Sequence, residues 1–176
     1  MKLTIAPRIK HCVLILCFSA LQVTMVGATE LLKRQPSGAI ILTVNDKTSL
    51  AQAPQSMRFD MAMLNSLPQK SFVTKTPWYK VAIKFSGPLL SDVLQALNVK
   101  GENLTATALN DYKVSIPLAD AIKHGAILAV RMDDKIFSVK DKGPVWFMYP
   151  FDAHPEINNT TYFSRAIWQL SAITVE

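Results

Sequence analysis

The chain has 176 residues, 49% of them hydrophobic, with 19 Lys and Arg against 13 Asp and Glu. This length and hydrophobic content are enough for one buried core, which excludes a largely disordered chain. The basic excess on its own would suggest a nucleic-acid-binding protein. Part of this excess, however, lies in the first 28 residues, which are considered next.

The first 28 residues have the pattern of a secretory signal peptide. Three basic residues precede fifteen uncharged residues, 12–26, and the stretch Val26-Gly27-Ala28 offers small or β-branched residues for cleavage after Ala28. The alternative is an uncleaved membrane anchor, which needs an apolar run of about 18 residues or more. We expect cleavage, and therefore an exported protein.

Loss of this segment changes the composition of the chain. The segment holds three of the 19 basic residues and no acidic one, so residues 29–176 carry a charge of about +3. Both cysteines, Cys12 and Cys17, lie in it as well, and Leu16 before Cys17 disfavours a lipoprotein. We therefore expect one domain, 29–176, without a thiol for a disulfide, a nucleophile or a soft metal, and without a nucleic-acid partner.

The hydrophobic pattern predicts short elements in the first half of the domain. In order, they are a buried strand (39–44), a loop or short helix (45–57), a helix (59–67), two short strands (71–75 and 80–85) and a helix (86–97). Asp60 is the expected N-cap of the first helix, and Ser86 with Pro88 the expected start of the second.

The second half is predicted to contain more strands than helices. In order, the elements are two strands about the turn Asn110-Asp111 (104–109 and 113–116), a short helix (117–123), a hairpin (127–132 and 135–139), a central strand (145–149) and a final strand (169–175). His124, beside Gly125 at a helix end, is expected to be solvated. Strands outnumber the short helices, so we predict an α+β fold with a mixed β-sheet.

Aromatic residues gather in the segment Lys140–Asp152. It holds four of the fifteen aromatic residues, Trp146, Phe147, Tyr149 and Phe151, behind a charged, glycine-containing turn. The first three lie in an apolar strand, so we expect at least two of them in the core. Trp78, in a turn, is harder to explain as a core residue.

Four segments together resemble the molybdopterin-binding domain of the sulfite oxidase fold, in its short, exported form. They are FSGPLLSDVL (85–94), ALNDYKVSIP (108–117), DKGPVWFMYP (141–150) and YFSRAIWQL (162–170). The resemblance covers residues 39–176. In members that catalyse oxidation, a cysteine before the GPLL-like corner holds molybdenum, but residues 71–85 contain no cysteine.

The resemblance therefore implies a pterin pocket without its metal ligand. We expect a neopterin- or monapterin-like ligand, no molybdenum and no catalysis. Short members of this kind resemble periplasmic proteins that report pterin status to a membrane-bound cyclic-di-GMP enzyme, so the implied partner is the periplasmic domain of an inner-membrane diguanylate cyclase/phosphodiesterase. The alternative is a molybdopterin-dependent oxidoreductase, or an accessory subunit of one.

Ten residues are predicted to bind the pterin: Trp78, Asp111, Tyr112, Asp141, Lys142, Tyr149, Asp152, Ser164, Arg165 and Trp168. A flat heterocycle needs a ring to stack on, first Trp78 and then Trp168. One of the three carboxylates is expected to accept from the ring N–H and amino groups. Lys142 is expected to close over the ligand from its loop, and Arg165 to stack on the ring or donate to side-chain hydroxyls.

Structural roles compete with two of these interpretations, and a metal site was also considered. Asp111 equally fits the turn between two strands, without a ligand. Arg165 equally fits a surface ion pair with Asp152 or Glu156. A metal site on Asp152, His154 and Glu156 is disfavoured, because this irregular segment holds only one histidine.

Overall fold

The computed structural model describes residues 34–48 and 55–176. The predicted signal peptide, its cleavage site after Ala28 and both cysteines lie outside these residues. Within the described ranges, no helix has the length and apolar character needed to cross a membrane.

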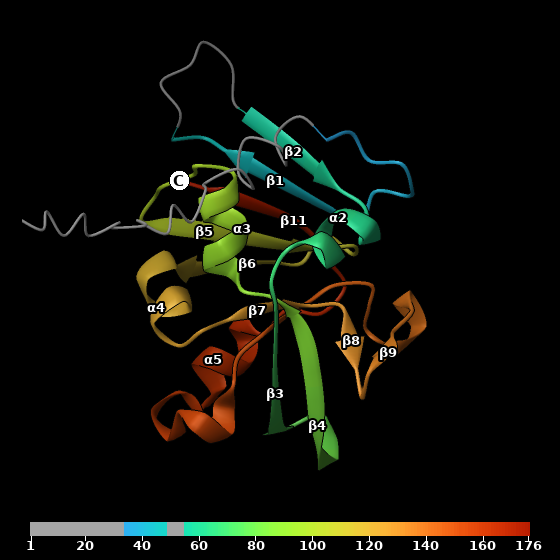
Figure 1. The fold of residues 1–176 in the computed structure, drawn as a ribbon. Coiled ribbons are helices and arrows are strands. Elements are labelled where there is room, and N and C mark those ends of the chain that lie inside the picture. The colour runs from blue at the N-terminus through green and yellow to red at the C-terminus, as the bar shows by residue number, and fades with distance from the viewer. Residues whose placement is uncertain (1–33, 49–54) are drawn as a thin grey trace, which may run out of the picture.

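A five-stranded sheet forms one layer of the molecule (Figure 1). In spatial order its strands are β2 (Gln55–Phe59), β1 (Leu42–Asp46), β11 (Leu170–Val175), β5 (Asn103–Ala108) and β6 (Lys113–Pro117). β1 and β11 are parallel, with Thr43 opposite Ala172, and the other neighbours are antiparallel. The last strand of the chain therefore occupies the centre of the sheet.

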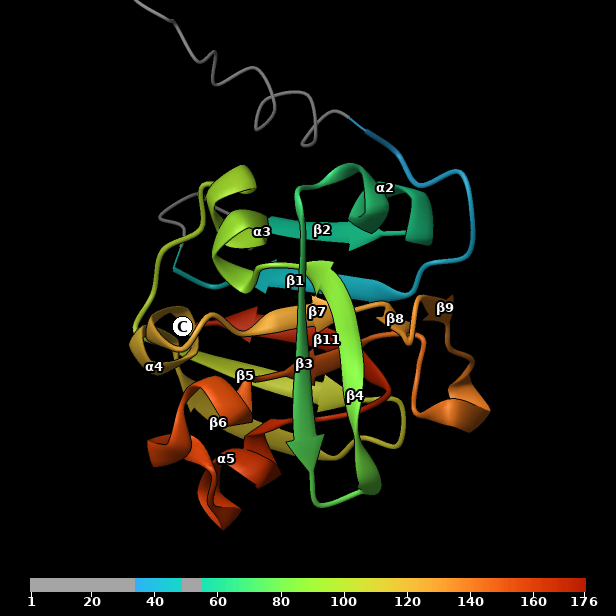
Figure 2. The ribbon, with the colours of Figure 1, turned by 60° about the horizontal axis from the view of Figure 1, so that its bottom comes forward.

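A long hairpin reaches away from this sheet and begins a second one (Figures 1 and 2). The strands of the second sheet are β3 (Gln69–Thr76), β4 (Tyr79–Pro88), β8 (Arg131–Met132) and β9 (Lys135–Ile136). The hairpin pairs from Gln69 opposite Pro88 to Thr76 opposite Tyr79, so the turn Pro77–Trp78 lies at its far end. The strands predicted at 71–75 and 80–85 are confirmed and are longer than predicted.

A third, two-stranded sheet pairs β7 (Ile127–Ala129) with β10 (Trp146–Met148). The single strand predicted at 127–132 is thus divided between β7 and β8, which belong to different sheets. The structure confirms the α+β class, with several sheets and few short helices.

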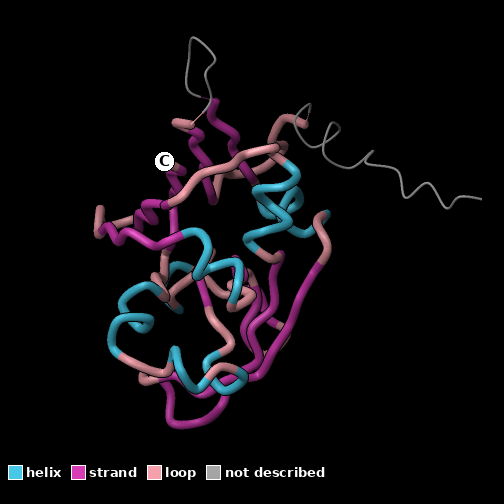
Figure 3. Tube along the Cα trace, turned by 90° about the vertical axis from the view of Figure 1, so that its left-hand side faces the viewer, coloured by secondary structure: helices cyan, strands magenta, loops and turns pink. Residues whose placement is uncertain are grey.

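Every helix in the described ranges is short (Figure 3). The helices are α2 (Met61–Ser66), α3 (Leu90–Ala96), α4 (Leu118–Lys123) and α5 (Thr160–Arg165), with the 3-10 turns η1 (Val139–Asp141), η2 (Phe151–Ala153) and η3 (Pro155–Ile157). Asp60 caps α2 as predicted, accepting from the Met63 amide at 2.8 Å. Asn159 caps α5, a helix that the sequence pattern did not predict.

Three predictions are wrong in detail. The helix predicted from 86 begins at Leu90, because Ser86 and Gly87 continue β4. Gly87 packs so closely on the next strand that a Cβ atom there would lie 2.0 Å from the carbonyl oxygen of Leu128. Residues 55–57, predicted as loop or helix, belong to β2. His124 is not solvated, since its ring packs against other aromatic rings and is 3% exposed.

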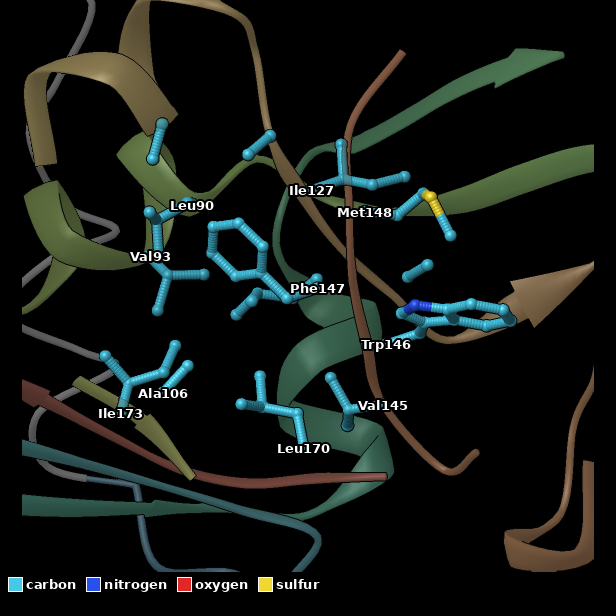
Figure 4. Packing of buried hydrophobic residues seen from close by; sticks show 14 of the residues in the cluster. Leu90, Val93, Ala106, Ile127, Val145, Trp146, Phe147, Met148, Leu170 and Ile173 are labelled. Carbon is cyan, nitrogen blue, oxygen red and sulfur yellow. The ribbon is translucent and has the colours of Figure 1, made fainter. Parts of the chain in front are cut away.

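The strand β10 passes through the core (Figure 4). Trp146, Phe147 and Tyr149 are each 0% exposed, which confirms the core role predicted for at least two of them. Successive side chains of a strand point to opposite sides. Phe147 accordingly points toward Leu90 and Val93 of α3, whereas Trp146 points the other way (Figure 4).

Candidate ligand-binding site

A cleft of about 420 Å³ opens where the far end of the β3–β4 hairpin meets the β5–β6 turn and the segment from α5 to β11. Small-molecule sites are typically about 300–1,000 Å³. The lining residues are Pro77, Trp78, Ala108, Asn110, Tyr112, Phe163, Ser164, Ile167 and Trp168. Segments that are far apart in the sequence thus supply the walls of one cleft.

Tryptophan rings form the apolar wall. The ring centres of Trp78 and Trp168 are 5.6 Å apart, and the two ring planes meet at 83°. Behind them, the buried Trp146 lies 5.3 Å from Trp78 and 6.0 Å from Trp168, and its indole N–H donates to the carbonyl of Ala166 at 3.0 Å. Because the two cleft rings are nearly perpendicular, a flat ligand can stack on only one of them at a time.

Polar groups come from the β5–β6 turn and from α5. The side-chain carbonyl of Asn110 accepts from the Tyr112 amide at 3.2 Å, which leaves the Asn110 NH₂ group as a donor. The Ser164 hydroxyl donates to the Thr161 carbonyl at 2.7 Å, so its lone pairs remain able to accept. With the Tyr112 hydroxyl, the cleft offers both donors and acceptors beside an aromatic wall.

A cation lies beside the aromatic wall. The ammonium of Lys142 is 5.4 Å from the centre of the Tyr79 ring and 5.9 Å from that of Trp168. The Lys142 carbonyl accepts from the Gln169 amide at 3.0 Å, which ties this loop to the residue after Trp168. Burial, and then the charge of Asp141, raises the pKa of the Tyr79 phenol. Lys142 therefore lies against the ring of a cleft residue, although it does not itself line the cleft.

Two residues that were predicted to bind the ligand, Tyr149 and Asp152, do not line the cleft and instead make contacts within the fold. Tyr149 is fully buried, and its hydroxyl has no hydrogen-bond partner among the described residues. Burial raises the pKa of this phenol. The Asp152 carboxylate accepts from the Lys75 amide at 3.1 Å, and its own amide donates to the Thr74 hydroxyl at 3.0 Å. Asp152 thus fastens η2 to β3.

Arg165 directly follows the cleft residue Ser164 at the end of α5, but does not line the cleft. Its guanidinium pairs with Asp120 of α4 at 3.1 Å and lies 4.8 Å from the Tyr162 ring centre. The alternative pairing with Asp152 or Glu156 is wrong, because α5 packs beside α4 and presents Arg165 to Asp120.

The last two predicted carboxylates lie in exposed turns. Asp111 has a left-handed backbone, φ +64°, in the β5–β6 turn, between Asn110 and Tyr112. Asp141 accepts from the Ser138 hydroxyl at 2.9 Å within its own turn. Of the ten predicted residues, the structure brings four together as lining of the cleft: Trp78, Tyr112, Ser164 and Trp168. Lys142 lies against the outer side of that group.

Several cleft residues were missed by the sequence analysis: Pro77, Ala108, Asn110, Phe163 and Ile167. Asn110 and Phe163 each neighbour a predicted residue, and Asn110 was noticed only as part of a turn. The local signal that could have indicated α5, and with it Phe163, is Asn159, a residue type that favours a helix N-cap. Ala108 has no local signal, because only the pairing of β5 with β11 brings it to the cleft, and Ile167 lies in the segment between α5 and β11, next to the predicted Trp168.

The family of the chain follows from its sequence match. Residues 42–151 match the model of the oxidoreductase molybdopterin-binding domain, and the chain belongs to this family. The predicted resemblance to the molybdopterin-binding domain is thereby confirmed over these residues, which include three of the four motifs. No curated protein matches the chain. The matched region includes the hairpin end and the β5–β6 turn, whereas α5 and Trp168 lie beyond it.

The residues present fit a pterin ring better than they fit a molybdenum ion. The cleft offers stacking surfaces and mixed hydrogen-bonding groups, which suit a flat, polar heterocycle. A thiolate ligand for the metal would have to come from cysteine, and the only cysteines of the chain, Cys12 and Cys17, precede the described residues. The cleft formed by the described residues therefore has the stacking surface and the hydrogen-bonding groups that a flat, polar heterocycle requires.

Proposed function

We propose that this protein binds a pterin, without molybdenum, in the cleft lined by Trp78 and Trp168. The observation that carries the proposal is the composition of that cleft. Two tryptophans are held by the buried Trp146, and the polar groups of Asn110 and Ser164 lie on the neighbouring wall. A neopterin- or monapterin-like compound has both features that this site would recognise, a flat ring and a hydrogen-bonding edge.

The first test is a titration of the purified full-length protein with neopterin and with monapterin, followed by quenching of tryptophan fluorescence. Stacking of an aromatic base on a protein ring is worth roughly 1–3 kcal/mol when the ring is replaced by alanine. Trp78→Ala or Trp168→Ala should therefore raise the Kd about 5-fold to 150-fold.

Ile122→Ala is a suitable control, because Ile122 is 47% exposed on α4, at the end of β6 opposite to the Asn110–Tyr112 turn. Its Kd should stay within about twofold of the unmodified protein. If Trp78→Ala and Trp168→Ala bind pterin as tightly as Ile122→Ala, the pterin does not bind in this cleft. If the unmodified protein binds no pterin, the proposal is refuted.

The metal content of the protein separates a binding protein from an oxidoreductase or its accessory subunit. Protein recovered from the exported fraction of the cells should release pterin on acid extraction, near one per chain, without stoichiometric molybdenum. Molybdenum at about one per chain would favour the oxidoreductase instead and would call for a ligand other than a thiolate from residues 34–176.

We further propose that pterin binding is reported to the periplasmic domain of an inner-membrane diguanylate cyclase/phosphodiesterase. This part rests on the resemblance to short, exported members of the fold. A ligand alters such signalling only if the partner binds the loaded and empty forms with different affinity. The test is the affinity of the partner domain for the protein with and without pterin, and equal affinities would refute the relay without affecting the binding proposal.

A further inference from the structure

Away from the cleft, the fold brings together two histidines and a glutamate. His124 follows α4, His154 lies between η2 and η3, and Glu156 belongs to η3. One nitrogen or oxygen atom from each of these side chains lies within 4.8 Å of those from the other two. The segments that supply them are 30 residues apart in the sequence, counted from His124 to His154. The His154 segment alone, with its one histidine, was a poor metal site, and the fold adds the second.

His124 is buried without a partner for one of its ring nitrogens. The side chain is 3% exposed, and Nδ1 makes no hydrogen bond with any described residue. Buried polar atoms in folded proteins nearly always have a partner. The atom facing Nδ1 is Glu156 Oε1, at 3.6 Å, which is too long for a hydrogen bond. At this spacing the two atoms could both bind one atom placed between them.

The distances match the coordination of a tetrahedral ion. Zinc binds histidine nitrogen and carboxylate oxygen at about 2.0–2.2 Å, so two such ligand atoms of a tetrahedral site are about 3.3–3.6 Å apart. Glu156 Oε1 is 3.6 Å from His124 Nδ1 and 3.4 Å from His154 Nδ1. Two edges of the tetrahedron are thus already present. The side chains of His154 and Glu156 are 34% and 58% exposed, which leaves them room to close the third edge.

The ligand chemistry agrees with the geometry. Neutral imidazole and carboxylate are ordinary ligands of first-row transition metals. Glu156 is exposed and His154 is partly exposed, so an ion has access from solvent.

We propose that His124, His154 and Glu156 form a binding site for one divalent transition-metal ion, with Zn²⁺ as the ion that fits best. The fourth position of the tetrahedron is open to water or to another small ligand. None of the three residues lines the pterin cleft. The α5 helix lies between the two sites, since its Tyr162 packs on His124 at 5.7 Å while Phe163 lines the cleft.

The test is calorimetric titration of the full-length protein with Zn²⁺ alone, after treatment with a chelator. Affinity purification should avoid a histidine tag, and Cys12→Ser with Cys17→Ser removes both thiolates of the chain. We expect one Zn²⁺ per chain. Loss of a group that only supports a metal ligand costs about 10–100-fold in affinity, so loss of a ligand in His154→Gln or Glu156→Gln should cost at least about tenfold.

Controls make the result specific. Glu102→Gln replaces an exposed glutamate away from the cluster, and should leave the affinity within about twofold. His124→Gln also alters a buried residue, so the two exposed ligands carry the test. Cobalt(II) in place of zinc should give the visible spectrum of a tetrahedral nitrogen and oxygen site.

Two outcomes would overturn the proposal. The first is no Zn²⁺ binding at one per chain. The second is binding that His154→Gln and Glu156→Gln leave unchanged, which would place the ion elsewhere on the surface. Neither outcome touches the pterin titration, because that experiment uses other residues and contains no added metal.

Discussion

Replacement of Trp146 by phenylalanine should show how much the packing behind the cleft contributes to the free energy of unfolding. Trp146 is fully buried and contacts the rings of Trp78, Phe85 and Trp168 at 5.3, 5.5 and 6.0 Å. Its indole N–H donates to the carbonyl of Ala166, which is itself 1% exposed. Phenylalanine keeps one aromatic ring but removes this donor.

The expected cost has two parts. A buried carbonyl left without its donor costs about 1–3 kcal/mol. The smaller ring forfeits burial equivalent to one or two methylene groups, roughly 1 kcal/mol. We therefore expect Trp146→Phe to lower the free energy of unfolding by about 2–4 kcal/mol, a large part of the ~5–15 kcal/mol typical of a domain.

Urea unfolding followed by far-UV circular dichroism measures this loss, since fluorescence would change with the substitution itself. With an m-value of about 2 kcal/mol per molar urea, the midpoint should fall by about 1–2 M. Trp168→Phe makes the same chemical change at a side chain that is 37% exposed, and should cost about 1 kcal/mol or less. Equal midpoints for the two variants would refute the assignment of Trp146 as the support of the cleft wall.

Three further predictions test a helix cap, a close backbone contact and an ion pair. Hydrogen bonds from backbone amides, that of Met63 first, lower the pKa of Asp60 from 3.8 to about 2. The ionised carboxylate therefore stabilises the folded state above pH 4, and this contribution is lost as the pH falls toward 2. Over this range the urea midpoint should fall more for the unmodified protein than for Asp60→Asn, and parallel curves would contradict the role of Asp60 as a cap. Gly87→Ala should cost about 3 kcal/mol or more in thermal unfolding, since its Cβ would lie 2.0 Å from a backbone oxygen, whereas Gly38→Ala, with its nearest contact at 3.6 Å, should change little. Arg165→Lys should lower stability by about 0.5–1 kcal/mol through its partly buried ion pair and leave the pterin Kd within about twofold; a larger rise in Kd would return Arg165 to the ligand site.

The sequence by itself determined the family and most of the local structure. The strands at 71–75, 80–85 and 169–175 and the Asp60 cap were predicted from residue type and spacing, because alternation and capping are properties of neighbouring residues. The restriction of cysteine to positions 12 and 17 is also a property of the sequence alone. These features are local, so no knowledge of the fold is needed to find them.

The cleft and the cluster of His124, His154 and Glu156 could not be predicted from the sequence, because only the tertiary structure brings their residues together. Trp78, Asn110 and Trp168 meet only because the hairpin, the β5–β6 turn and the segment after α5 converge at one end of the molecule. His124 was expected in solvent because a residue at a helix end usually lies there, but the packing of its ring against His154 and a tyrosine of α5 buries it. Such positions depend on contacts between residues far apart in the chain, whereas a sequence pattern reports only on neighbours.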